Sequence, residues 1–569
     1  MFEAGQLPEP PAEIIVVTAR ALPDPLSDRA YSIELIDRDD LARSPRTQLD
    51  EVLKQVPGLQ LFRRSDSRSG HPTSQGVTLR ALGGNASSRA LLVLDGVPQA
   101  DPFGGWINWP AYDPLSLAEV RVIRGGGSVT YGPGALAGVI DMMSSLEGGF
   151  AAGLDAGSRE SLDGRASMAG SVGTGTLRVT GRAGRGDGFI PITAETRGSA
   201  DERAGYEAAN ARAQWAGRVT DALELQLSAS GFVDRRNRGL DFTGNRTDGL
   251  DTSVRLVGRG RLPFAVLGYA QWRELESSFA AVDSGRTTAT RVSLQDDVPS
   301  NALGGSFEVR PSVSENLELR MGGDARQTEG ESRELFSFVD GEPTRRRVAG
   351  GQTLTFGAFA DATLKTGRLT LNGGGRLDRW RIWDGELREW LLASGSPLRD
   401  DQFTSLSGWL PTARLGGVFD AKGGWSIRSA AYLGWRLPTL NEFFRPFRAG
   451  LDATAANAGL KPERLRGAEV GVDYQLNGLS LSLTAFTNRL GKAIANVTLG
   501  QGPGLFPGVG FVPAGGEYRQ RRNLDAVASR GIEASVEFRR GPWLAQGGLS
   551  LVKARVQGDG PANELDGLR

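Results

Sequence analysis

The sequence predicts a mostly β fold, in which a large antiparallel β-barrel follows a smaller N-terminal α+β domain. From residue 150 onward, apolar and polar residues alternate with period two, as in strands with one apolar face. The chain contains no apolar run near the ~18 residues of a membrane helix. A form that spans a bilayer would therefore have to be a closed β-barrel, which satisfies every backbone group between strands.

The connections between the expected strands favour a barrel over a sandwich. Tight turns are expected at Asn477-Gly478, 365–367 and 539–542. Long polar loops are expected, one strand later each time, at roughly 235–250, 327–348, 380–410, 436–465 and 487–528. Short turns at one end and long loops at the other are typical of transmembrane barrels.

Composition excludes several classes of function. Lys plus Arg and Asp plus Glu both number 66, so no net basic field would attract nucleic acid. Cysteine is absent and histidine occurs once, at His71, which argues against thiol chemistry, a catalytic triad and a histidine metal site. We therefore expect no enzyme, no catalytic residue, no metal site and no cofactor. The simplest reading of His71 itself is a solvated loop residue.

The chain begins with an acidic, proline-rich stretch, residues 1–12, that we expect to be a flexible tail. It lacks the basic and apolar regions of a signal peptide. A β-branched run with a strong preference for extended structure follows over 13–19, which by itself reads as a first strand. Its residues are Glu13, Ile14, Ile15, Val16, Val17, Thr18 and Ala19.

The N-terminal domain shows strand and helix signals in turn. A strand is expected over 33–36, and a helix starts at 38–41. Residues 47–56 form an amphipathic helix that Pro57-Gly58 ends. The unbroken apolar run within 90–97 predicts a strand buried on both faces.

A glycine-rich segment, residues 119–141, joins two buried strands. Gly127 and Gly132 have the spacing of a phosphate-binding loop, but Pro133 stands where that loop needs its lysine. A phosphate site is therefore excluded.

The segment 119–141 instead resembles the end of the plug domain of TonB-dependent outer-membrane receptors. Their pattern, Glu-x-Val-x-x-Ile-Arg-Gly-x-x-Ser-x-x-Tyr-Gly-x-x-Ala-x-x-Gly-Val-Ile, is followed closely, with Val122 one place out of step. Phrases at 56–59, 90–97 and, in the barrel, 434–463 also match. The resemblance spans 13–553 and is nearest, in the plug, to receptors for vitamin B12 and ferric siderophores.

The resemblance implies the domain layout. Residues 1–12 are a tail, 13–19 a TonB box, 20–147 a plug that occludes the lumen, and 148–569 the transmembrane β-barrel. Barrels of the family have 22 strands, whereas this sequence offers about eighteen or nineteen candidates and no final aromatic-terminated strand. We therefore expect a piece of a longer protein that lacks the last few strands, and a signal peptide that was removed or omitted.

The same resemblance implies active transport across the bacterial outer membrane by a monomer embedded in lipid. The TonB box would add a strand to TonB, the energised periplasmic partner. A ferric siderophore is the first expectation for the cargo. Cobalamin, or ligand sensing without transport, is the alternative, and a haem receptor is disfavoured because only one histidine exists.

Two plug loops, 60–76 and 96–113, correspond to apical loops that face the ligand in the family. Their candidate ligand-facing residues are Arg63, Arg64, Arg68, His71, Asp101, Phe103, Trp106, Asn108 and Trp109. The three aromatic residues suit either a wall for a flat ligand or packing against the barrel. Four barrel-loop arginines, Arg235, Arg236, Arg238 and Arg246, suit an anionic metal chelate or are simply solvated.

Three further plug arginines are expected to hold the plug in place. Arg80, Arg121 and Arg124 could form salt bridges to acidic residues on the barrel wall.

Overall fold

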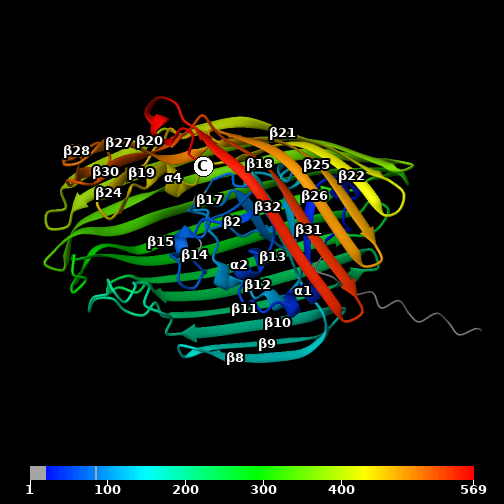
Figure 1. The fold of residues 1–569 in the computed structure, drawn as a ribbon, viewed down its shortest axis with the longest axis horizontal. Coiled ribbons are helices and arrows are strands. Elements are labelled where there is room, and N and C mark those ends of the chain that lie inside the picture. Colours follow the sequence, from blue (N-terminus) through cyan, green and yellow to red (C-terminus); the bar gives the residue numbers. More distant parts are fainter. Residues whose placement is uncertain (1–20, 64, 84–85, 569) are drawn as a thin grey trace, which may run out of the picture.

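The computed structural model describes residues 21–63, 65–83 and 86–568. A barrel of long strands surrounds a small N-terminal domain, whose elements fill its lumen (Figure 1). The expected tail, the expected TonB box at 13–19 and Arg64 lie outside the described residues. No helix within the described ranges is both long and apolar enough to span a membrane.

The plug is built on a five-stranded sheet with the order β1-β6-β7-β4-β5. Its elements are η1 (Leu26–Ala30), β1 (Ser32–Asp37), α1 (Arg38–Arg43), α2 (Leu49–Leu53), β2 (Leu59–Leu61), η2 (Pro72–Ser74), β3 (Val77–Leu79), β4 (Ala90–Leu94), β5 (Val97–Pro98), η3 (Trp109–Ala111), η4 (Pro114–Ser116), β6 (Leu117–Arg124), α3 (Ser128–Tyr131) and β7 (Gly138–Ser144). The helix expected over 47–56 is shorter, because only 49–53 is helical before turns lead into Pro57-Gly58.

The glycine-rich segment supplies two strands of this sheet. β6 and β7 pair antiparallel, and Gly138 faces Arg124 at the end of the ladder. Gly138 has φ +149°, and a Cβ there would lie well inside contact distance of the Ile123 carbonyl oxygen. Glycine is therefore needed here for the close approach of two backbones.

Among the described residues, nineteen strands form the closed order of the barrel. They are β8 (Gly149–Gly157), β9 (Ser161–Val172), β10 (Gly175–Gly186), β11 (Tyr206–Thr220), β12 (Leu223–Asn237), β13 (Gly244–Gly258), β14 (Phe264–Val282), β15 (Ala289–Val309), β16 (Ser312–Ser314), β17 (Leu317–Val339), β18 (Glu342–Thr366), β19 (Leu369–Leu391), β20 (Pro397–Phe403), β21 (Leu406–Asp420), β22 (Trp425–Arg436), β25 (Glu463–Leu476), β26 (Leu479–Gly491), β31 (Ala526–Arg540) and β32 (Trp543–Gln557). That further strands follow in a longer protein stays a prediction.

Three of the expected long loops lie largely in strands; in the first, 235–250, only residues 238–243 fall between β12 and β13. Residues 327–348 belong to β17 and β18, which meet at a turn of two residues, and most of 380–410 lies in β19, β20 and β21. Polar strand ends that extend beyond a bilayer keep their ladder without an apolar face, so alternation of hydropathy does not reveal them.

The two longest loops carry elements of their own. These are α4 (Leu440–Phe444), β23 (Phe447–Ala449), β24 (Asp452–Ala455), β27 (Ile494–Gln501), β28 (Gly504–Phe506), β29 (Gly510–Val512) and β30 (Glu517–Asn523). β23, β24, β30 and β27 form a four-stranded sheet beside the barrel. A 3₁₀ helix, η5 (Gly560–Leu565), follows β32.

Candidate functional site

One side of the plug is joined to the barrel wall by a buried ion-pair network. Arg80 donates to Glu469 Oε2 at 2.6 Å, to the Tyr432 hydroxyl at 2.9 Å and to Glu533 Oε2 at 3.1 Å. The side chains of Arg80 and Glu469 are both 0% exposed. Nearby, Arg89 pairs with the buried Glu463 at 2.7 Å. These charges are removed from water and paired by short charge-assisted hydrogen bonds.

Arg124 and Arg121 make different contacts because they lie three positions apart on β6, and side chains at that spacing point to opposite faces of a strand. Arg124 pairs with Glu34 of the plug at 3.1 Å and approaches Glu533 of the barrel at 3.7 Å. Arg121 pairs with Asp24 at 2.8 Å and with Asp28. The prediction that Arg121 reaches an acidic residue on the barrel wall is therefore wrong.

The aromatic residues of the second plug loop are buried rather than exposed to a ligand. Phe103, Trp106 and Trp109 are 1%, 3% and 0% exposed. Phe103 and Trp106 pack in one cluster with barrel-side residues that include Ile382, Leu440 and Phe443. Phe103 and Trp106 therefore pack the plug against the barrel, as the alternative reading had it. Trp109 lies in the plug core.

Two polar residues of this loop are buried with the rings. Asp101 accepts hydrogen bonds from the backbone nitrogens of Phe103 and Gly104 at 3.0 and 2.9 Å. Burial raises the pKa of Asp101 to about 6, although these bonds and two arginines oppose the shift. Asn108 is also buried, and its side-chain amide has no partner among the described residues.

The first plug loop reaches the barrel through Arg68 and His71. Arg68 pairs with Asp163 of β9 at 3.0 Å and lies over the Tyr206 ring. His71 Nδ1 accepts from the Thr73 backbone nitrogen at 3.1 Å, which leaves Nε2–H to donate to Ser277 Oγ at 3.2 Å. The imidazole also stacks on Phe279, so His71 is not the solvated residue that the sequence suggested.

A group of arginines surrounds His71. Burial lowers the pKa of His71 well below its usual value, and the charges of Arg238, Arg236, Arg445 and Arg63 lower it further. Arg521 adjoins Arg445 and donates to its carbonyl oxygen at 2.6 Å. We call Arg63, Arg236, Arg238, Arg445 and Arg521 the apical arginine cluster.

Two members of this cluster, the buried Arg521 and the half-buried Arg238, are held by carbonyl oxygens rather than by carboxylates. Arg238 donates to the carbonyls of Thr243 and Ser278, and Arg521 to those of Asn441 and Arg445. Neither makes an ion pair with a carboxylate among the described residues, and burial lowers the pKa of each to about 10. The arrangement leaves partly desolvated positive charge that an anion would stabilise.

Two of the predicted arginines do not join the cluster. Arg235 and Arg246 face each other across β12 and β13, and both are exposed. Their neighbour Arg236 points the opposite way and is held by Asp234 and by the carbonyls of Ser67 and Gly70. Side chains alternate across a strand, so a run of adjacent arginines cannot all face the lumen.

Arg445 and Arg521 are members that the sequence did not indicate. Arg445 follows α4, which is fixed at its start by a capping box between Thr439 and Glu442. The Thr-x-x-Glu spacing is visible in the sequence and marks the helix. It does not show which loop the following arginine will meet.

Two family models match this chain. One, described as the TonB-dependent receptor plug domain, matches residues 25–139, and the other, the β-barrel of TonB-dependent receptors, matches residues 160–567. The chain belongs to the TonB-dependent receptor family. Its members are outer-membrane receptors and transporters rather than enzymes, so the outer-membrane location of this receptor follows from the family.

Individual relatives are distant. The receptor is 23% identical over 492 residues to the vitamin B12 transporter BtuB of Vibrio vulnificus, covering 85% of this chain and 71% of that one. It is 23% identical over 549 residues to the iron-regulated outer membrane virulence protein of Vibrio cholerae, covering 92% and 75%. The ferric yersiniabactin uptake receptor FyuA of Yersinia pestis shares the fold, with a TM-score of 0.68, 16% identity, and coverage of 93% and 79%.

Proposed function

We propose that this receptor imports an anionic metal chelate, most simply a ferric siderophore, by TonB-driven transport. The observation that carries the proposal is the apical arginine cluster, in which the half-buried Arg238 and the buried Arg521 make no ion pair with a carboxylate of the described residues. The names of two similar proteins, the ferric yersiniabactin receptor and the iron-regulated virulence protein, point the same way.

Arginine suits this cargo for two reasons. Its planar guanidinium donates several hydrogen bonds to oxygen ligands that carry negative charge, such as carboxylates and catecholates. In a partly desolvated position these bonds are also stronger than in water. Arg63, which is exposed at the plug apex and stacks on Phe62, would meet the chelate first.

Residues 13–19 would be the segment on which TonB pulls. An extended segment of this kind can add a strand to TonB and transmit a pull to the plug. Ligand can promote this step only if its affinity differs between the two plug states. His71 and Arg236 connect the apical loop to β14 and β12, so they would transmit such a difference.

Cobalamin is the second candidate cargo. The similarity to the vitamin B12 transporter of Vibrio vulnificus extends over 85% of this chain, although at 23% identity.

The test is uptake by a strain that lacks its own siderophore and cobalamin receptors and expresses the full-length receptor. Radiolabelled iron is supplied as a catecholate, a hydroxamate or a carboxylate siderophore, and labelled cobalamin is supplied in parallel. We expect uptake of one ferric siderophore, abolished by deletion of residues 13–19. Binding without uptake would indicate a sensor, and uptake that survives the deletion would contradict TonB-driven transport.

Binding of that cargo also tests the arginine cluster. Because a hydrogen bond to a charged group contributes about 1.5–3 kcal/mol, Arg238→Gln or Arg521→Gln should each weaken binding by about tenfold or more. Arg246→Gln is the matched control, since Arg246 is on a neighbouring strand but faces outward. Equal effects of all three substitutions would show that the cluster is not part of the binding site.

A further inference from the structure

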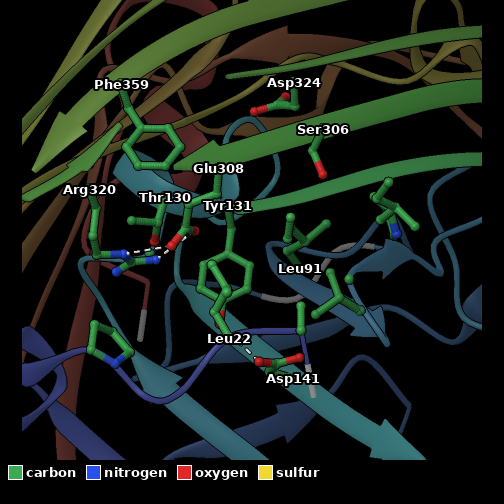
Figure 2. Close-up of a pocket in the computed structure, with 18 of the residues that line it drawn as sticks. Leu22, Leu91, Thr130, Tyr131, Asp141, Ser306, Glu308, Arg320, Asp324 and Phe359 are labelled. Atoms are coloured by element: carbon green, nitrogen blue, oxygen red, sulfur yellow. Dashed lines mark hydrogen bonds and ion pairs between the residues drawn. The ribbon is translucent and has the colours of Figure 1, made fainter. Parts of the chain in front are cut away.

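Side chains on the barrel strands alternate between the lumen and the outer surface. On β15, Ser306 and Glu308 point into a cavity of the lumen, where Glu308 pairs with Arg320 at 3.0 Å (Figure 2). Phe307, between them, is 51% exposed on the outer surface. Because successive side chains on a strand point to opposite faces, the same alternation shows which residues of the other strands face outward.

The outer surface of β25, β26, β31 and β32 carries six cations near the end of the barrel with the long loops. These four strands lie side by side (Figure 1). All six residues are exposed, and we call them the basic face: Arg464, Arg466, Arg489, Arg530, Lys553 and Arg555. Arg466 lies directly opposite Arg489, and Arg530 directly opposite Lys553. Like charges opposite each other destabilise a sheet, so this face favours a bound anion.

Carboxylates compensate little of this charge. Within the described part of the chain, only Arg489 of the six makes an ion pair, with Asp525 at 2.9 Å, and both side chains are about half-exposed. Another part of the wall differs. Across β11 to β14, four outward residues follow one another as acid, base, base and acid: Glu207, Arg235, Arg246 and Glu276. The excess of positive charge is therefore a feature of β25 to β32.

The basic face lies at one border of the membrane. Trp543, which is 75% exposed beside the short turn between β31 and β32, lies ten positions from Lys553 on the same face of β32. Ten strand residues extend about 33 Å, which at a tilt of about 35–45° covers roughly 25 Å of depth, the height of the apolar band of such barrels. Aromatic residues mark the borders of that band. With Trp543 at the periplasmic border, Lys553 lies at the level of the outer-leaflet headgroups.

An apolar groove of about 520 Å³ lies on the same outer surface, nearer the short turns. Its outward lining residues are Val472, Leu481, Leu483, Ala534, Val536, Gly547 and Leu549. The small Ala534 and Gly547 create the hollow among longer side chains, and Trp425 packs on Tyr474 at its edge with ring centroids 4.7 Å apart. Ala534 lies four positions from Arg530 on β31, about 13 Å along the strand, which is less than the roughly 15 Å depth of one leaflet. An acyl chain that starts at the basic face therefore reaches the groove.

We propose that this face of the barrel binds a lipid of the outer leaflet that carries more than one phosphate group. The basic face holds the phosphates, because guanidinium groups donate charge-assisted hydrogen bonds to phosphate oxygens. One acyl chain lies in the groove. A free anion would use the charges but not the groove, so the two features together favour a lipid. The proposal requires only the outer-membrane location and does not depend on the imported cargo.

The test is native mass spectrometry of the full-length receptor in detergent, titrated with lipid A that carries two phosphates. Lipid A with one phosphate and zwitterionic phosphatidylethanolamine are titrated in parallel. We expect affinity to fall with the number of phosphates, and phosphatidylethanolamine to bind at least about tenfold more weakly than the bisphosphorylated lipid. Equal affinity for the three lipids would overturn the proposal.

Charge variants locate the headgroup. Arg530→Gln with Lys553→Gln removes one opposed pair of the basic face. Arg235→Gln with Arg246→Gln is the matched control, because it removes an opposed outward pair that glutamates flank. The first double variant should bind bisphosphorylated lipid A about tenfold more weakly, and the control should bind it like the parent. Equal weakening in both would mean that any positive surface attracts the lipid, which contradicts a site at β25 to β32.

A pair of tryptophan variants tests the groove. Ala534→Trp fills it, and Ala413→Trp makes the same change at an outward position of β21. Ala534→Trp should weaken lipid binding several-fold and Ala413→Trp should not. All these substitutions are on the outer surface, so each variant should still migrate as a compact barrel without heating. If inorganic pyrophosphate displaces the lipid and Ala534→Trp has no effect, the site holds a free anion and the proposal is wrong.

Discussion

Arg80 shows how much of the plug's attachment depends on one side chain. It bridges Glu469 of β25 and Glu533 of β31, and it lies in the turn that follows β3 of the plug. Its ring contact with Phe486 adds an apolar surface to the same site. A charge buried in this way is stable only while every partner is present.

Arg80→Gln should therefore weaken the plug by about 3–5 kcal/mol, because two carboxylates lose their shared cation. The expected result is faster proteolysis of the plug within an intact barrel. Arg43→Gln, which removes an exposed pair with Asp39, is the control and should change the free energy of unfolding by less than about 1 kcal/mol. Similar proteolysis of the two variants would show that the buried network does not hold the plug.

Asp101 gives a dependence on pH with a defined sign. Its pKa in the folded protein is about 6, above its ordinary value of 3.8, so the fold favours the neutral carboxyl. The stability that this contributes is fully present below pH 3.8 and is lost as the pH rises through 6. At neutral pH the buried carboxylate is a net cost.

Asp101→Asn should stabilise the plug at pH 7 by about 1–3 kcal/mol, because the amide oxygen can still accept from Phe103 and Gly104 without a charge. At pH 5 the difference between variant and parent should shrink by about 1–2 kcal/mol. This stability difference is measured by thermal unfolding of the plug at both pH values, monitored by tryptophan fluorescence. A difference that is constant with pH would show that Asp101 is ionised in the fold.

At the scale of elements, the short hairpins were the most predictable part of the barrel. Asn477-Gly478 joins β25 to β26 with φ of 52° and 79°, as expected for a two-residue turn. Gly478 is also crowded, since a Cβ would overlap the Arg539 carbonyl oxygen. Gly541, in the hairpin between β31 and β32, has φ +56° and open space around it.

These two glycines make a matched pair. Gly541→Ala should cost about 1–2 kcal/mol, because only the backbone conformation is strained. Gly478→Ala should cost more, because the hairpin must also separate from β31. Both can be measured as the fraction of receptor that refolds into lipid vesicles and migrates as a compact barrel without heating. Equal yields would mean that the overlap at Gly478 is relieved at no cost.

At the scale of the whole molecule, buried ion pairs join the plug to β25 and β31, whereas residues 22–30 are held largely by partly exposed ones. Salt should distinguish them, since exposed charges are screened and buried ones are not. Raising sodium chloride from 0.05 M to 1 M shortens the Debye length from roughly 14 to 3 Å. Amide hydrogen exchange should therefore speed up over residues 22–30. Exchange at β3 and β4, beside Arg80 and Arg89, should not change. Uniform acceleration would show that the buried pairs resist salt no better than the exposed ones.

The sequence by itself determined the strands, the hairpin turns and the family. Alternation with period two, the Asn-Gly turn and the spacing of residues 119–141 are local, so each can be read from a few consecutive residues. It also indicated Arg63 and Arg238 as charged loop residues. The loops expected at 235–250, 327–348 and 380–410 are largely strands, because polar strands and polar loops have the same composition.

The tertiary structure alone decided which of these residues meet. Arg445 and Arg521 join Arg63 and Arg238 only because the barrel brings distant loops over the plug apex. Arg121 turns to Asp24 and Asp28 while Arg124 reaches Glu533, because the opposite faces of one strand meet different neighbours. Phe103 and Trp106 are covered by α4, a helix that follows more than 300 residues later in the chain. Long-range contacts of this kind depend on how the barrel closes around the plug. No local pattern of residues shows which distant segments this closure brings together.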